Sequence, residues 1–194
     1  METFLNVADN ILVGGGMSFP FVKKMGGQIG SSLCLEDELE IVADFLSKAK
    51  KTKTNIILPI DCVITDNIKS RSHISIKEIG RIPLNYMGVD IGPKTIKLFK
   101  KHILNSKLIM WNGPMGIAET EEFSNGTRKI ANYIVRSTNL GAYSLIGGGD
   151  TVSDVSRLGL KNKFSYISTG GGAMLEFFKK NYLEPTIDLI KINN

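Results

Sequence analysis

The sequence is poor in the residues that most often build metal and redox centres. Its 194 residues include only two cysteines and two histidines. Cys34 and Cys62 match no metal or redox spacing, so we expect two ordinary reduced thiols. His73 and His102 are isolated and are expected on the surface. No Ser, His and Asp arrangement has the spacing of a catalytic triad, which leaves no support for a hydrolase of that class.

Long apolar runs are also missing. No segment approaches the roughly 20 apolar residues that cross a bilayer. Glu2, Asn6 and Asp9 interrupt the apolar residues near the start, so no signal peptide is predicted. A hydrophobic content of 42% and a charged content of 22% are typical of a globular chain. We therefore expect a cytoplasmic protein, with no membrane partner, that folds as one domain over residues 1–194.

The positive charge is modest and scattered. The formal net charge is +5, and the lysines fall mostly on expected helix ends and surface loops. No basic stripe is interleaved with aromatic residues, so a nucleic-acid partner is not expected. The excess suits small anionic ligands, but for any one lysine cluster a solvated surface is the favoured explanation.

Glycine is abundant, and its placement is informative. Nine of the 20 glycines form three triplets. These are Gly14, Gly15 and Gly16; Gly147, Gly148 and Gly149; and Gly170, Gly171 and Gly172. Each triplet follows a short apolar run and precedes a possible helix start. Because glycine lacks a side chain, such turns let backbone amides and a helix N-terminus approach an anion closely. The triplets predict a phosphate or nucleotide site.

The order of apolar runs and helical patterns predicts an α/β fold. Strands are expected at residues 11–13, 55–59, 107–111, 143–146 and 164–168, and helices at 36–51, from 93 onward, around 123–134 and at 173–180. Residues 65–82 are expected to form a long polar excursion. This alternation predicts a doubly wound parallel sheet, a Rossmann-like three-layer α/β/α domain. The glycine turns would then lie at the carboxyl edge of the sheet, where ligands bind in such folds.

Two standard nucleotide fingerprints are absent. The dinucleotide pattern G-x-G-x-x-G would require glycine in place of Phe19, Val152 or Leu175. The P-loop pattern comes nearest at residues 88–95, where Pro93 separates Gly92 from Lys94. Any nucleotide site must therefore be of another kind.

Three segments have alternative interpretations. Asp150 could hold Mg²⁺ beside Thr151 and a phosphate, or it could simply be the N-cap of the next helix. Gly170 to Gly172 could present amides to a transferring group or form a tight turn. Residues 111–116, with the single tryptophan, could belong to a site or be a structured loop.

Taken together, five segments resemble phosphoglycerate kinase in their order and separation. They cover residues 14–17, 90–93, 111–116, 147–151 and 168–173, and so span nearly the entire chain. The resemblance is to the C-terminal, nucleotide-binding domain of that two-domain enzyme, without its first segment.

The resemblance implies a function for each segment. The family transfers a phosphoryl group in glycolysis between 1,3-bisphosphoglycerate and ADP, giving 3-phosphoglycerate and ATP, with Mg²⁺. By this resemblance, the adenine would contact Gly14, Gly15, Gly16 and Gly92, and the ribose would contact Pro114 and Glu119. The phosphates would contact Asn112, Gly149 and Thr151, and Asp150 would bind Mg²⁺. The catalytic amides would be those of Gly170, Gly171 and Gly172.

Departures from the family pattern limit these implications. Ala118 stands where the family usually has an aromatic residue, and Pro20 where it has a helix former, so we expect an altered nucleotide affinity. The N-terminal domain, with its basic patch and catalytic arginine, and a lysine-bearing segment before residue 1 are absent. We therefore expect this chain to bind Mg-ADP or Mg-ATP weakly and to show little turnover. Phosphoglycerate would be contacted only through the other domain. We also expect an exposed edge that favours instability or self-association. The full-length family is usually monomeric.

Two other functions remain open on the sequence. The first is a nucleotide-binding module without catalysis. The second is a domain whose glycines serve only the fold.

Overall fold

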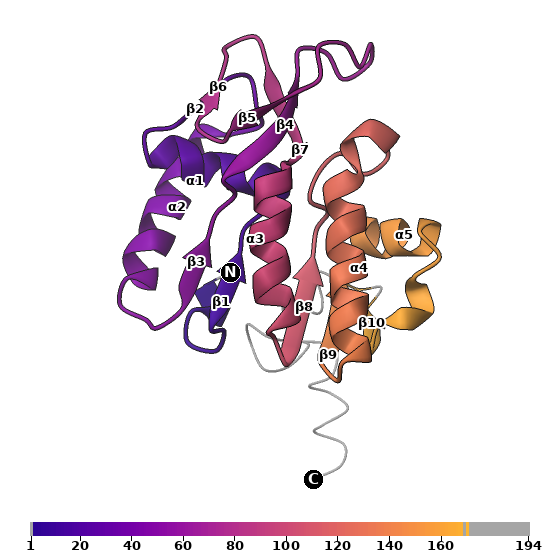
Figure 1. The fold of residues 1–194 in the computed structure, drawn as a ribbon. Helices are drawn as coiled ribbons and strands as arrows, with labels where there is room; N and C mark the ends of the chain where they lie inside the picture. Colours follow the sequence, from indigo (N-terminus) through magenta and orange to yellow (C-terminus); the bar gives the residue numbers. More distant parts are fainter. Residues whose placement is uncertain (1, 169, 171–194) are drawn as a thin grey trace, which may run out of the picture.

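Short parallel strands organise the computed structural model, which describes residues 2–168 and 170 (Figure 1). β1 (Asn10–Leu12) pairs with β3 (Asn55–Ile57), and β8 (Leu108–Asn112), β9 (Tyr143–Gly147) and β10 (Tyr166–Ser168) form a second parallel sheet in the order β10-β9-β8. The five strands expected from the sequence are all confirmed, with ends that differ by one to a few residues. The predicted helix at 173–180 lies outside the described residues.

Helices separate the parallel strands along the chain. They are α1 (Ser18–Lys24), α2 (Glu36–Ala49), α3 (Pro93–Leu104), α4 (Asn125–Asn139) and α5 (Gly149–Arg157), with short 3₁₀ turns at Glu2–Phe4, Gly15–Met17, Glu121–Phe123 and Lys161–Lys163. α1 forms despite Pro20, because this residue lies in the first helical turn, where amides have no intrahelical acceptor. The α/β class is confirmed.

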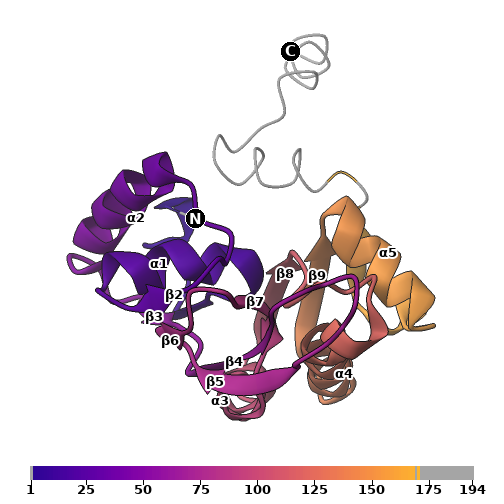
Figure 2. The same cartoon turned by 90° about the horizontal axis from the view of Figure 1, so that it is seen from above.

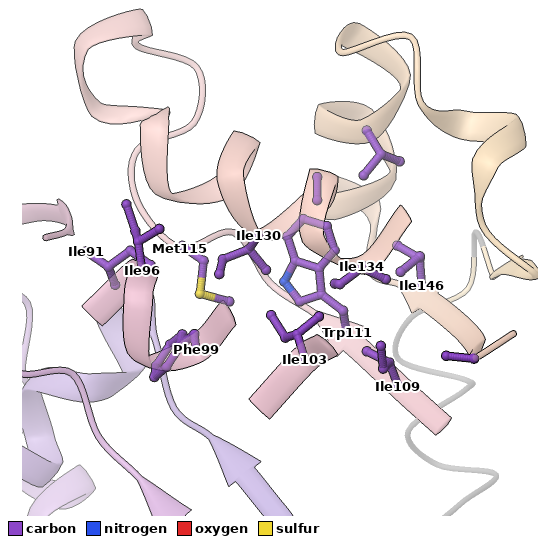
Figure 3. Close-up of a cluster of buried hydrophobic side chains, with 13 residues drawn as sticks. Ile91, Ile96, Phe99, Ile103, Ile109, Trp111, Met115, Ile130, Ile134 and Ile146 are labelled. Atoms are coloured by element: carbon purple, nitrogen blue, oxygen red, sulfur yellow. The ribbon is translucent and has the colours of Figure 1, made fainter. Parts of the chain in front are cut away.

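Two clusters of buried side chains place helices on opposite sides of the strands. α1 and α2 pack on β1 and β3 through Phe21, Val42 and Phe45. α3 and α4 pack on β8 and β9 through a larger cluster that includes Phe99, Trp111 and Ile134 (Figure 3). The view from above shows α1 and α2 on one side and α3 and α4 on the other (Figure 2). On α4, Ile130, Ala131 and Ile134 are buried in this larger cluster.

The chain between α2 and α3 also holds an antiparallel sheet that the sequence analysis did not predict. β4 (Asp61–Thr65) pairs antiparallel with both β5 (Ser75–Glu78) and β7 (Met87–Ile91). A separate parallel pair joins β2 (Gln28–Ile29), which precedes α2, to β6 (Arg81–Ile82). Every residue of β5 is exposed, which explains why residues 65–82 read as a polar excursion. The fold therefore contains the antiparallel strands β4, β5 and β7 in addition to the parallel strands that the sequence predicted.

The two parallel sheets lie side by side without joining. Leu12 of β1 and Ile57 of β3 pack against the cluster that lies under β8 and β9. Among the described strands, however, β1 pairs only with β3, and β8 only with β9. β1 and β8 therefore each have one edge that no described strand pairs with.

Two buried aspartates connect the antiparallel sheet to the helices. Asp61, at the start of β4, accepts hydrogen bonds from the amides of Lys94 and Thr95 in the first turn of α3, at 3.0 and 2.8 Å. Asp90 on β7 accepts one from the amide of Gly126 in the first turn of α4, at 2.7 Å. Both carboxylates satisfy amides that lack an intrahelical partner, so they fix where each helix begins.

Replacing Asp61 with alanine should destabilise the fold. The change leaves two amides at the start of α3 without an acceptor, which should lower the free energy of unfolding by roughly 2–4 kcal/mol. Urea unfolding measures the loss. Asp44→Ala is the matched control, because Asp44 is exposed and pairs with Lys48 on the surface. Equal stability of the two variants would contradict the proposed anchoring.

Asp90 should make stability depend on pH. Burial raises the pKa of its carboxyl from 3.8 to about 7, against the opposing effect of the amides of Gly126 and Ile91 and the charge of Arg128. Between these two values the folded chain keeps a proton that the unfolded chain has lost. The free energy of unfolding should therefore fall as the pH rises from about 4 to about 7, by at most about 1.4 kcal/mol per pH unit from this group.

Asp90→Asn isolates that contribution, because asparagine does not ionise. Urea unfolding at several pH values in this range should give a steeper decline for the original chain than for the variant. Asp44→Asn serves as the control and should keep the full decline. Parallel curves for the original chain and Asp90→Asn would contradict the assignment.

Candidate functional site

The loop of residues 112–116 lies at the centre of the candidate site. It follows β8 at the carboxyl edge of the parallel strands. Trp111 Nε1 donates to the carbonyl of Gly113 at 2.7 Å, and the amide of Met115 donates to Thr127 Oγ1 at 2.9 Å. Trp111 and Met115 themselves lie in the buried cluster of Figure 3. The loop is thus fixed by these two hydrogen bonds and by the packing of Trp111 and Met115 in the buried cluster.

The first glycine triplet packs against this loop. Gly15 has φ +60°, and a Cβ there would lie 2.6 Å from the carbonyl oxygen of Pro114. A Cβ on Gly14 would overlap Met115 Sδ. Gly16 is exposed, and a Cβ there would meet only Leu33, at an ordinary 3.7 Å. The first two glycines are therefore required by the close approach of the two turns.

The second glycine triplet reaches the same loop from the other side. Gly147 ends β9 and pairs with Asn112. Gly148 has φ +92°, and a Cβ there would lie 2.7 Å from Asn112 Oδ1. Thr151 is buried, and its Oγ1 accepts a hydrogen bond from the amide of Gly113 at 2.7 Å. Its hydroxyl donates no hydrogen bond to the residues that the structure describes. The predicted residues of the second triplet and of the loop are thus brought together.

Asp150 is not the N-cap of α5. Gly148 occupies that position, and Asp150 lies in the first turn, so the capping interpretation is wrong. Its side chain is exposed and makes no hydrogen bond or ion pair with the residues that the structure describes. No group of three potential metal ligands occurs in residues 2–168 and 170. A cation at Asp150 would therefore need further oxygen ligands from a bound anion and water.

Glu119 lies on the turn that follows the loop. It is exposed, whereas Ala118 before it is buried. The guanidinium of Arg157, from the end of α5, donates through Nη2 to the carbonyl of Ala118 at 2.7 Å and also to Asp154 Oδ1. Burial raises the pKa of Asp154, and the charges of Glu119 and Asp150 raise it further, against the opposing effect of Arg157.

Sequence reasoning missed both Asp154 and Arg157. A usable signal was present, because Asp154 follows Asp150 by four positions and such residues share a helix face. Ala118, whose carbonyl accepts from Arg157, lies 39 positions away in the sequence, and nothing local indicates that contact.

Other predicted residues lie apart from this junction. Gly92 is the N-cap of α3 and packs on Asp61, where a Cβ would overlap the carboxyl group, so its position already has a structural reason. Gly170 is exposed beyond β10. Gly171 and Gly172 lie outside the described residues, as does Thr169. The roles assigned to these glycines stay predictions.

A cavity of about 230 Å³ lies at the opposite end of β8 and β9. It is lined by residues 104–107 together with Ser137, Leu140 and Ala142. None of the predicted site residues is among them, and Lys107 is its one charged side chain. The glycine turns at the carboxyl edge therefore remain the candidate site.

Within the described part of the chain, no helix is long and apolar enough to cross a membrane.

Comparisons with known proteins agree on one family. The family model "Phosphoglycerate kinase" matches residues 1–181. The chain is 46% identical over 179 residues to phosphoglycerate kinase of Dictyoglomus turgidum, which covers 92% of this chain and 45% of that protein. It is 46% identical over 182 residues to the enzyme of Thermosipho africanus, with the same shares covered.

Solved structures give the same result. Phosphoglycerate kinase from Coxiella burnetii matches with a TM-score of 0.89 and 37% identity, over 96% of this chain and 47% of that one. The enzyme from Pyrococcus horikoshii matches with a TM-score of 0.72 and 27% identity, over 98% and 48%. The chain thus spans about half the length of the relatives that it matches. With a family match over nearly its whole length, the chain belongs to the phosphoglycerate kinase family.

Proposed function

We propose that the chain is the nucleotide-binding half of a phosphoglycerate kinase, which binds Mg-ADP or Mg-ATP and acts in cytoplasmic glycolysis when joined to its other half. The observation that supports this most directly is the convergence of two glycine triplets on the loop of residues 112–116, with Asp150 exposed beside it. At Gly14, Gly15 and Gly148, side chains are excluded by the close approach of the loop of residues 112–116. Amides and a helix N-terminus are then left to face an anion.

The donors around Asp150 fit Mg²⁺ bound together with a nucleotide. Mg²⁺ is commonly held by one or two carboxylates plus substrate phosphates and water, which agrees with a single exposed carboxylate. When bound, the ion would neutralise phosphate charge. Gly149 and Thr151 would border the phosphates with Asn112, and Pro114 and Glu119 the ribose. Gly14 to Gly16 and Gly92 would border the adenine.

The phosphoglycerate side of the reaction would come from outside this chain. Phosphoryl transfer relies almost entirely on positioning and on cationic groups around the transferred phosphate. The chain matches only about 45% of its relatives' length, and the free edges of β1 and β8 favour completion by a further strand. We therefore propose weak nucleotide binding and little turnover for the chain by itself, with Gly170 to Gly172 facing the group in transit.

A second candidate is a nucleotide-binding module without catalysis. It uses the same site and needs no second half. The short span of the chain relative to its relatives is the observation that favours it.

Calorimetric titration with ADP, with and without Mg²⁺, tests the nucleotide site. The chain should bind Mg-ADP, and Asp150→Ala should abolish the metal-dependent part of the affinity while metal-free ADP binds as before. Asp44→Ala, on α2 at the opposite side of the fold from α5 (Figure 1), should leave both affinities unchanged. No binding of Mg-ADP by the unmodified chain would refute the nucleotide site.

Complementation separates the two candidate functions. The chain should show little conversion of 3-phosphoglycerate and ATP alone, and activity should appear when a separately produced N-terminal half of a phosphoglycerate kinase is added. A coupled assay measures the turnover. Mg-ADP binding without activity in the mixture would favour the non-catalytic module. Turnover by the chain alone at the rate of an ordinary kinase would overturn the proposed dependence on a second half.

A further inference from the structure

Arg157 connects two segments of the candidate site that are distant in sequence. Its Nη2 donates to the carbonyl of Ala118 at 2.7 Å, directly before Glu119, and to Asp154 Oδ1 on its own helix. Asp150, Asp154 and Arg157 follow one another at spacings of four and three positions, so they share one face of α5. The face that bears the proposed metal ligand is thus fastened to the turn that bears the proposed ribose ligand.

The hydrogen bond to Ala118 restrains Glu119 itself. The carbonyl of Ala118 belongs to the peptide plane that joins the two residues. Fixing this plane limits the backbone rotation that orients the Glu119 side chain. One residue earlier, the amide of Ile117 donates to the carbonyl of Val89 at 2.9 Å. The start of the turn, directly before Glu119, is therefore held by both β7 and α5.

The buried carboxylate of Asp154 makes the Arg157 contact hard to break. The residue is 4% exposed, and its Oδ2 has no hydrogen-bond partner in the described part of the chain. Within that part, Arg157 is the cation that pairs with it. A buried carboxylate without a cation is costly, so the guanidinium is confined to this place although half of its own side chain is exposed.

The arrangement is also favoured by its charges. The carboxylates of Glu119 and Asp150 lie close enough to Asp154 to repel its charge, and the Arg157 guanidinium, which pairs with Asp154, opposes that repulsion.

We propose that Arg157, held by Asp154, is a positioning residue that sets the spacing between the ribose end and the metal-phosphate end of the nucleotide site. Arg157 acts through the turn and does not touch the nucleotide. The inference rests on the proposed nucleotide site and adds the group that couples its two ends. A ligand that uses both ends should depend on Arg157, and a ligand that uses only the phosphate end should not.

Titration with two ligands tests this coupling. Mg-ADP spans both ends of the site, whereas Mg-pyrophosphate occupies only the metal-phosphate end. Arg157→Ala should weaken Mg-ADP binding about tenfold, the size expected for one charge-assisted hydrogen bond. Its affinity for Mg-pyrophosphate should be unchanged. Arg157→Lys keeps the cation and should recover part of the Mg-ADP affinity.

The matched control is Arg136→Ala. Arg136 is exposed on α4, and its side chain has no hydrogen bond or ion pair with the described residues, so the variant loses the same charge without the contact. Both affinities should stay as in the original chain. If Arg157→Ala does not fold because Asp154 is left unpaired, the double variant Asp154→Asn, Arg157→Ala removes both charges and should show the same selective loss.

The outcomes separate the inference from the proposed function. If the original chain does not bind Mg-ADP, the nucleotide site fails and the inference fails with it. If it binds, and Arg157→Ala weakens both ligands equally or neither, the nucleotide site stands and the coupling role is refuted. Selective loss of Mg-ADP affinity, partly restored by lysine, supports the inference.

Discussion

The hydrogen bond from the amide of Gly113 to Thr151 Oγ1 is the contact on which the arrangement of the site depends. It joins the loop after β8 to the first turn of α5 within a buried setting, where an unpaired amide would be costly. With this loop fixed, Pro114 and Met115 form the surface on which the first glycine triplet packs. Segments from three separate strand ends therefore meet at one place because one short loop is held from both sides.

Glycine has two distinct uses around this loop. Gly15 and Gly148 have positive φ angles and approach the loop so closely that a side chain would collide with it. Gly116 and Gly126 instead make room for the buried carboxyl of Asp90, which a Cβ at either position would overlap or approach to 2.5 Å. Because Gly116 and Gly126 lack side chains, the Asp90 carboxyl of β7 can reach the first turn of α4. Some glycines of this sequence thus allow turns to meet at the site, and others allow the buried packing of Asp90 beneath it.

The sequence predicted the parts of the fold whose signals are local. The five parallel strands and the helices α2, α3 and α4 were found near the residues where apolar runs and helical patterns predicted them. β4, β5 and β7 were missed because their pairing is between distant segments and because β5 is wholly exposed, so its pattern resembles a loop. The placement of Asp150 was open on the sequence because aspartate both caps helices and binds metal, and only the backbone shows that Gly148 is the cap. The contact of Arg157 with Ala118 has no local signal at all.

The free edges of β1 and β8 differ from the outer edges of an ordinary sheet. A segment added at an outer edge forms backbone hydrogen bonds on one side only. A parallel segment that paired with both β1 and β8 would form them on two sides and would merge two sheets that now share only side-chain contacts. Pairing with one of the two strands would leave the sheets separate. Only a segment that pairs with both would join the helices on β1 and β3 to those on β8 and β9 through one continuous layer of backbone hydrogen bonds.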